Sequence, residues 1–189
     1  DICARRISSQ SQVSERFKLD HWRLAGNGAD MIRPDVMQAF VDAFGDAGFK
    51  ASSFLPSYGL AEATLAVSIM PPGEGIQVEL VEESELTGVP GSNDRPTRYR
   101  AIVNCGKAAK DMKIEVRDAD GNILPDRVIG KVWCTGPSLM VGYFRDPEST
   151  EACMQDGWLD TGDMGYLSNG YIYIVGRAKD MIIINGKNH

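Results

Sequence analysis

The clearest pattern of apolar and polar positions lies near the end of the chain, over residues 158–177. Apolar and β-branched residues alternate there with polar ones, which predicts strands, and the Ser-Asn-Gly run at residues 168–170 predicts a hairpin turn between them. We also expect a tight turn at Gly162 and Asp163. Neighbouring strand ends would then bring Asp163 and Arg177 together.

A carboxylate and a guanidinium in such a place suit one kind of ligand. Asp163 can accept hydrogen bonds from two adjacent hydroxyls, as on a ribose, and Arg177 can hold the same sugar or a phosphate. Spacing alone supports a plain β-hairpin with a surface ion pair equally well. The pattern by itself therefore leaves both interpretations open.

The first part of the chain has the pattern of an α/β protein. A short strand at residues 22–25 leads into a Gly-rich turn at residues 26–30. Apolar residues then recur at helical spacing after Pro34, and Gly45 or Gly48 is expected to end this helix. A strand that ends in a Gly-rich turn before a helix is the usual place for a ligand in an α/β sheet.

Residues 49–68 carry two side chains with ligand chemistry. A short strand is expected to reach Leu55, and an Ala-rich helix is expected to begin near Ala61. The ring of Tyr58 can lie against a flat base, and Glu62 is a hard oxygen ligand of the kind that Mg²⁺ prefers beside phosphates. On spacing alone, a core tyrosine and a glutamate that complements the helix dipole are the better interpretation.

Residues 103–175 have a mostly-β pattern. Strands are expected at residues 113–117 and 129–136, an Asp-Gly turn at residues 118–122 and a short helix at residues 147–152. The predicted fold class is α/β followed by a mostly-β part.

Composition narrows the classes of function. A net charge of −6 and a pI near 5.0 argue against nucleic-acid binding, because no basic stripe is available to displace counterions. No apolar run is long enough for a membrane span, and there is no signal-peptide pattern. Four cysteines lie far apart, which predicts reduced thiols and a cytoplasmic protein. The chain opens without Met inside a helical pattern, so we expect it to be a piece of a larger protein.

Three motifs resemble those of the adenylate-forming enzymes, the superfamily of acyl-CoA synthetases, luciferases and peptide-synthetase adenylation domains. They are Tyr-Gly-x-x-Glu at residues 58–62, Trp-Leu-x-Thr-Gly-Asp at residues 158–163 and Gly-Arg-x-Lys-Asp at residues 176–180. The resemblance implies that Asp163 binds the ribose hydroxyls and that Arg177 lies beside the ribose. It also implies that Asp180 is the hinge of a small C-terminal domain.

The resemblance assigns the earlier motifs as well. It implies that Gly28 and Ala29 lie against the adenosine and that Tyr58, followed by Gly59, stacks on the adenine. It implies that Glu62 binds Mg²⁺ beside the ATP phosphates, which makes it both the catalytic and the metal-binding residue.

Two features resemble the fatty-acyl-AMP ligases in particular. Ala61, which the resemblance places in the nucleotide site, stands where most of the superfamily has Thr, and Ala is usual in these ligases. Residues 71–104 resemble the insertion that restrains the C-terminal domain in these ligases and disfavours the conformation that uses CoA. The alternative is a tolerated surface loop, since long insertions cost little loop-closure entropy.

The resemblance implies four parts. These are the end of an α/β adenylate-binding subdomain (residues 1–70), the insertion-like region (residues 71–104), a distorted β-barrel subdomain (residues 105–177), and the hinge with the start of a C-terminal domain (residues 178–189).

The implied function of the whole protein is activation of a fatty acid with ATP and Mg²⁺, giving acyl-adenylate and pyrophosphate, for transfer to an acyl-carrier protein. A fatty-acid–CoA ligase is the alternative within the same chemistry, and a non-catalytic nucleotide-binding or carrier-docking module is the alternative from another class. The chain shows neither a phosphate loop ending in Lys nor a C-terminal catalytic lysine, so we expect this piece alone to be inactive.

Overall fold

The computed structural model describes residues 2–7, 13–87, 97–178, 183–184 and 187–188. The α-helices are α1 (Ile2–Ile7), α2 (Val13–Arg16), α3 (Pro34–Phe44), α4 (Glu83–Thr87) and α5 (Pro147–Cys153). Short 3₁₀ turns cover Gly45–Ala47, Ala51–Ser53 and Ala61–Ala63. The strands are β1 (Ala25–Asn27), β2 (Phe54–Leu60), β3 (Leu65–Ile69), β4 (Val78–Glu82), β5 (Tyr99–Ala108), β6 (Lys113–Arg117), β7 (Gly130–Thr135), β8 (Met154–Gln155), β9 (Trp158–Ser168), β10 (Tyr171–Arg177), β11 (Ile183–Ile184) and β12 (Lys187–Asn188).

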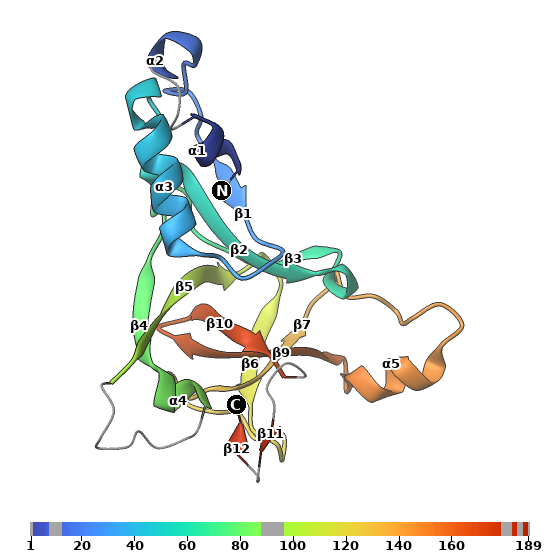
Figure 1. The fold of residues 1–189 in the computed structure, drawn as a ribbon. Helices are drawn as coiled ribbons and strands as arrows, with labels where there is room; N and C mark the ends of the chain where they lie inside the picture. Colours follow the sequence, from blue (N-terminus) through green and yellow to red (C-terminus); the bar gives the residue numbers. More distant parts are fainter. Residues whose placement is uncertain (1, 8–12, 88–96, 179–182, 185–186, 189) are drawn as a thin grey trace.

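Most of these strands join one curled sheet. Its order is β1-β2-β3-β5-β10-β9-β7-β6, with β4 paired to β5 and β8 paired to β9 (Figure 1). β1 and β2 run parallel, and the other pairs in this sheet run antiparallel. Figure 1 shows α1, α2 and α3 beside β1 and β2 at one end of the molecule, and α5 on a loop that projects from another side. The predicted α/β part followed by a mostly-β part is confirmed.

Helix α3 forms where the sequence predicts it. Pro34 occupies the first turn, where its missing N–H costs nothing, and the helix buries Met37 and Phe44. Gly48 ends the following 3₁₀ turn at φ +94°, a conformation that favours glycine. Phe40 stacks on Phe44 with ring centroids 4.5 Å apart, so the helix is held by an aromatic cluster against β1 and β2.

The helix expected from Ala61 does not form. A single 3₁₀ turn is followed by two residues at positive φ, Thr64 at 57° and Leu65 at 114°, which reverse the chain into β3. β3 then pairs with both β2 and β5 and buries Val67 completely, so pairing with distant strands outweighs the local helix propensity of the Ala-rich run. Gly59 permits this reversal, since a Cβ there would lie 1.5 Å from the carbonyl oxygen of Leu65.

The tight turn expected at Gly162 and Asp163 is also wrong. β9 continues through both residues. Three of its residues, 161–163, stand opposite the single residue Val132 of β7. This is a β-bulge, and Gly162 accommodates it at φ +72°. The hairpin turn at residues 168–170 is confirmed as a two-residue connection between β9 and β10.

Two apolar clusters lie beside the curled sheet. The larger one includes the buried residues Tyr58, Val67, Cys105, Val132, Cys134, Leu159 and Ile172. The smaller one joins β4, α4 and β5 to β9 and β10 through Val81, Leu86, Ile102, Tyr166 and Val175. The second cluster therefore ties part of residues 71–104 to the two strands that carry the closing motifs.

None of the helices in the described ranges is long and apolar enough to cross a membrane. Asp180, the predicted hinge residue, lies outside the described residues. Beyond it, β11 and β12 pair as a short antiparallel ladder.

Candidate functional site

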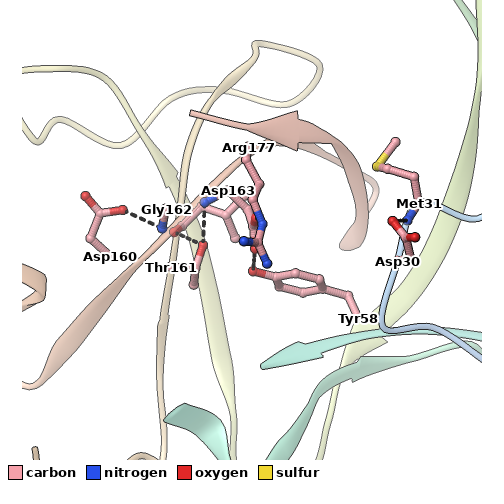
Figure 2. A network of polar contacts seen from close by, with 9 residues as sticks. Asp30, Met31, Tyr58, Asp160, Thr161, Gly162, Asp163 and Arg177 are labelled. Carbon is pink, nitrogen blue, oxygen red and sulfur yellow. Dashed lines mark hydrogen bonds and ion pairs between the residues drawn. The ribbon is translucent and has the colours of Figure 1, made fainter. Parts of the chain in front are cut away.

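Three of the predicted site residues meet in space. Tyr58 on β2 donates its hydroxyl hydrogen to Oδ2 of Asp163 on β9, at 2.6 Å. Arg177 on β10 stands opposite Asp163 in the ladder, with its Nε 3.7 Å from Oδ1 of that carboxylate. Figure 2 shows the three side chains gathered at one point, with Asp30 and Met31 across from them.

The bulge in β9 fixes the direction of Asp163. Thr161 donates its hydroxyl hydrogen to the carbonyl of Val132 at 2.8 Å, and the Thr161 hydroxyl oxygen accepts a hydrogen bond from the backbone N–H of Asp163 at 3.2 Å. Asp160 accepts a hydrogen bond from the backbone N–H of Gly162 at 3.0 Å (Figure 2). Each member of the Thr-Gly-Asp motif is therefore held from a neighbouring backbone or side-chain group, and bulges are a common means of re-aiming a side chain.

Burial sets the electrostatics of this group. It raises the pKa of Asp163, against the opposing effects of the hydrogen bond from Tyr58 and the charge of Arg177. Burial and the nearby Asp163 charge also raise the pKa of Tyr58, so its phenol remains protonated and remains a donor. The Arg177 side chain is 75% exposed and the Asp163 side chain 15%, so the carboxylate lies inside and the guanidinium at the edge.

A cavity of about 600 Å³ opens beside these residues. Described residues from five elements and the loop between β1 and α3 line it: Ala29, Asp30, Met31, Ile32, Ser57, Tyr58, Gly59, Leu86, Arg100, Ala101, Val103, Cys105, Asp163, Ile174, Val175, Gly176 and Arg177. The lining combines apolar side chains with converging charged and polar groups, an arrangement that suits a small polar ligand.

Gly28 and Ala29 follow β1 at the edge of this cavity. A Cβ on Gly28 would lie 2.8 Å from the carbonyl oxygen of Ser57, so glycine lets the turn approach β2 closely. Ala29 takes the left-handed φ of 73° and lines the cavity. The turn therefore brings backbone, rather than a bulky side chain, to the place where we expect the adenosine.

Glu62 lies in the turn after β2, outside the group of residues that lines the cavity. Its Oε1 accepts a hydrogen bond from the hydroxyl of Tyr143 at 2.7 Å, and its carbonyl accepts one from the backbone N–H of Met140 at 2.7 Å. The carboxylate raises the pKa of Tyr143 to about 12. The loop before α5 thus reaches back over the turn that holds Ala61 and Glu62.

The carboxylate of Glu62 has the oxygen chemistry that Mg²⁺ prefers. Among the described residues there is no group of three or more His, Cys, Asp or Glu placed to hold a metal ion alone. Mg²⁺ usually takes one or two carboxylates and completes its octahedron with substrate phosphates and water, so a single carboxylate is sufficient here.

The structure adds two residues that motif reasoning did not single out. Arg100, from the first half of β5, lines the cavity and donates from Nη2 to the carbonyl of Val175 at 2.8 Å. Tyr143, in the loop before α5, contacts Glu62. Neither contact has a local signal, because each joins segments at least 75 positions apart.

The model of the AMP-binding enzyme family matches residues 4–144. A protein of Caulobacter vibrioides named "Putative acyl-CoA synthetase" is 47% identical to the whole chain, which covers 33% of that relative. The medium-chain-fatty-acid–[acyl-carrier-protein] ligase JamA of Moorena producens is 34% identical over 99% of the chain, again 33% of the relative. The chain thus spans about a third of the length of these curated relatives.

A solved structure from a study of fatty acyl-adenylate ligases of E. coli and L. pneumophila superposes with a TM-score of 0.87. It is 40% identical in sequence, and the match covers 100% of this chain and 34% of that one. The chain therefore belongs to the AMP-binding enzyme family, and it is similar in sequence and fold to fatty-acyl-AMP ligases. Enzymes of this family are ATP-using ligases that form adenylates.

Proposed function

We propose that the protein containing this chain activates a fatty acid with ATP and passes the acyl group to an acyl-carrier protein. A carboxylate oxygen of the fatty acid attacks the α-phosphorus of ATP. The bond from that phosphorus to the bridging oxygen of pyrophosphate breaks, so acyl-adenylate and pyrophosphate form. The observation that carries the proposal is the meeting of Tyr58, Asp163 and Arg177 at a cavity in a chain of the AMP-binding family.

In this proposal, Asp163 and Arg177 bind the ribose of ATP. Oδ2 of Asp163 is occupied by the Tyr58 hydroxyl, but each carboxylate oxygen has two acceptor directions, so the group can still receive hydrogen bonds from both ribose hydroxyls. Arg177 is exposed enough to move onto a sugar or phosphate oxygen.

The adenine lies between the ring of Tyr58 and the turn at Gly28 and Ala29 in this proposal. Tyr58 and Ala29 line the cavity, and Gly28 directly precedes Ala29, so a flat base in the cavity can reach both the ring and the turn. Ala61 borders the phosphates without offering them a hydroxyl. Since a carboxylate is a poor nucleophile, these contacts serve chiefly to align it with the leaving group.

Glu62 is the metal-binding and catalytic residue of the proposal. When bound there, Mg²⁺ would neutralise charge on the ATP phosphates. Asp180 is the proposed hinge, with residues 1–70, 71–104, 105–177 and 178–189 as the proposed parts of the chain. We place the protein in the cytoplasm, in keeping with its separated cysteines.

The molecule that accepts the acyl group distinguishes the main proposal from the fatty-acid–CoA ligase. The similarity to a relative named as an acyl-carrier-protein ligase, and the extra segment at residues 71–104, support transfer to a carrier. The similarity to a relative named as an acyl-CoA synthetase supports a fatty-acid–CoA ligase. A nucleotide-binding module without catalysis remains the alternative of a different class.

One experiment distinguishes the three. The full-length protein is incubated with dodecanoate, ATP, Mg²⁺ and CoA, and the products are identified by mass spectrometry. Acyl-adenylate without acyl-CoA supports transfer to an acyl-carrier protein, and acyl-CoA supports the fatty-acid–CoA ligase. Bound ATP with neither product supports the non-catalytic nucleotide-binding module. The 189-residue chain, tested in parallel, is expected to give no product.

A further inference from the structure

Strand β10 is irregular just before Arg177. Its pairing with β9 shifts between Ile174 and Gly176, which makes Val175 the extra residue of a β-bulge. The carbonyl of Val175 accepts a hydrogen bond from Nη2 of Arg100 at 2.8 Å. The guanidinium of Arg100, on strand β5, therefore donates a hydrogen bond to the carbonyl oxygen at the bulge.

The side chain of Val175 is held by the same segment of chain. It is 5% exposed and packs in the cluster that contains Val81, Leu86 and Ile102. All three of these residues, like Arg100, come from residues 71–104. This stretch thus fixes the bulge twice, once through a charge-assisted hydrogen bond and once through apolar burial.

The bulge lies directly beside the nucleotide-site residues. Arg177 follows Val175 by two positions and is the ladder partner of Asp163, and all three line the cavity together with Arg100. A shift of the bulge would change where Arg177 points, because a bulge sets the local twist and the direction of the side chains after it.

We propose that Arg100 is a positioning residue of the nucleotide site. By holding the carbonyl of Val175, it sets the bulge that aims Arg177 at Asp163, and it makes nucleotide affinity depend on residues 71–104. This inference rests on the proposed function, because it takes Asp163 and Arg177 as the groups that hold the ribose.

The test measures AMP binding to the full-length protein by titration calorimetry. Arg100→Met keeps the apolar stem and removes every donor. It is expected to weaken AMP binding about five- to tenfold, which is less than the full strength of a hydrogen bond from a charged donor because the loss reaches AMP only through Arg177. Arg100→Lys retains a donor and is expected to recover at least half of that loss on a logarithmic scale. Arg98→Ala, which removes the same charge from an exposed residue outside the cavity lining, is the matched control and is expected to bind as the wild type does.

A double-mutant cycle separates positioning from direct contact. In an Arg177→Ala background, Arg100→Met is expected to change AMP affinity by less than about twofold, since its effect passes through Arg177. An equal loss in both backgrounds would overturn the inference, and so would unchanged affinity of Arg100→Met in the wild-type background. If a variant at position 100 fails to fold, Val81→Ala tests the same bulge from its apolar side and is expected to weaken AMP binding. A wild-type protein that binds no AMP would instead refute the proposed function.

Discussion

The hydroxyl of Tyr58 lies 2.6 Å from Oδ2 of Asp163, although the two residues are 105 positions apart. This contact joins the end of the α/β part to the bulge of β9. Through it the partly buried carboxylate of Asp163 receives a hydrogen bond from an uncharged hydroxyl. The tyrosine therefore contributes to the fold in addition to the proposed contact of its ring with a base. Under the proposed function, stability and ligand binding are coupled at this point.

Replacing Tyr58 with Phe keeps the ring and removes the donor. Because the hydrogen bond from Tyr58 lowers the pKa of Asp163, its loss is expected to raise that pKa further and to cost about 1–2 kcal/mol of stability at neutral pH. Urea unfolding and a carboxyl NMR titration measure the two effects. Tyr99→Phe, at an exposed tyrosine, serves as the control, and a variant as stable as the wild type would show that the contact contributes nothing.

Asp163→Asn is expected to separate binding from stability. The amide oxygen can still accept the hydrogen bond of Tyr58, but the neutral group no longer holds two ribose hydroxyls strongly, so AMP binding should weaken at least about tenfold. The thermal unfolding midpoint should stay level or rise, since a desolvated charge is removed. Asp126→Asn is the matched control for the charge, because this carboxylate lies in the loop before β7 and accepts a hydrogen bond from the backbone N–H of Asn169. Retained affinity in Asp163→Asn would contradict the ribose assignment.

The pH dependence of Asp163 has a definite sign. Its pKa is raised in the fold, so the folded state takes up the proton more readily than the unfolded chain. This group therefore adds stability as the pH falls through its folded pKa toward the ordinary aspartate range, whereas AMP affinity falls over the same window because the carboxylate is lost. Stability and affinity curves of the wild type and Asp163→Asn, measured side by side against pH, test this. The variant should lack both changes.

Gly59→Ala is expected to destabilise the protein strongly. The new Cβ would lie 1.5 Å from the carbonyl oxygen of Leu65, which is backbone and cannot rotate away. The expected cost is about 3 kcal/mol or more, seen as a lower midpoint in urea. Gly26→Ala has no heavy atom within 4 Å of the added Cβ and should change the midpoint little. Equal midpoints for the two variants would mean that the approach of β3 to β2 is not tight.

Glu62→Gln keeps the hydrogen bond of Tyr143, because the amide oxygen can accept it, but removes the negative charge. Adenylation measured by ATP–pyrophosphate exchange in the full-length protein is expected to fall about a hundredfold, while the unfolding midpoint stays the same. Tyr143→Phe, which leaves the carboxylate intact, should lose less than about tenfold. A Glu62→Gln protein with unchanged exchange would exclude Glu62 as the proposed metal ligand.

Buried thiols are expected to be slow to alkylate. Burial raises the pKa of Cys105 to about 11 and that of Cys134 to about 12, so little thiolate forms at mildly alkaline pH. Cys3 is exposed and should be labelled first by iodoacetamide, as mass spectrometry of the native protein can show. Labelling in denaturant is the control, in which all four cysteines should react. Rapid labelling of Cys105 in the native protein would mean that its strand opens readily.

Much of the arrangement could be predicted because its signals are local. Pro34 and Gly48 mark the ends of the α3 segment through their backbone preferences, and Asn169 with Gly170 marks the turn between β9 and β10. The grouping of Asp163 with Arg177 followed from their places on neighbouring strands. Their roles toward a nucleotide, like those of the other predicted site residues, stay predictions.

Other features were beyond local reasoning. The Ala-rich run after Ala61 has helix propensity, yet it turns into a strand because β2 and β5 offer pairing partners from distant segments. The Thr-Gly-Asp run has turn-forming residues, yet it is a bulge inside β9 because β7 continues to pair on both sides of it. The same residues suit either conformation, and the partner strands decide between them.

The sequence by itself determined the family motifs, the fold class, and the residue types that a nucleotide site requires, since these depend on side-chain chemistry and short-range backbone preference. Only the tertiary structure decided that Tyr58 donates to Asp163, that Tyr143 contacts Glu62, and that Arg100 holds the bulge before Arg177. Each of these contacts joins segments that meet solely through strand pairing and burial of apolar surface, and no spacing along the chain encodes where such segments come together.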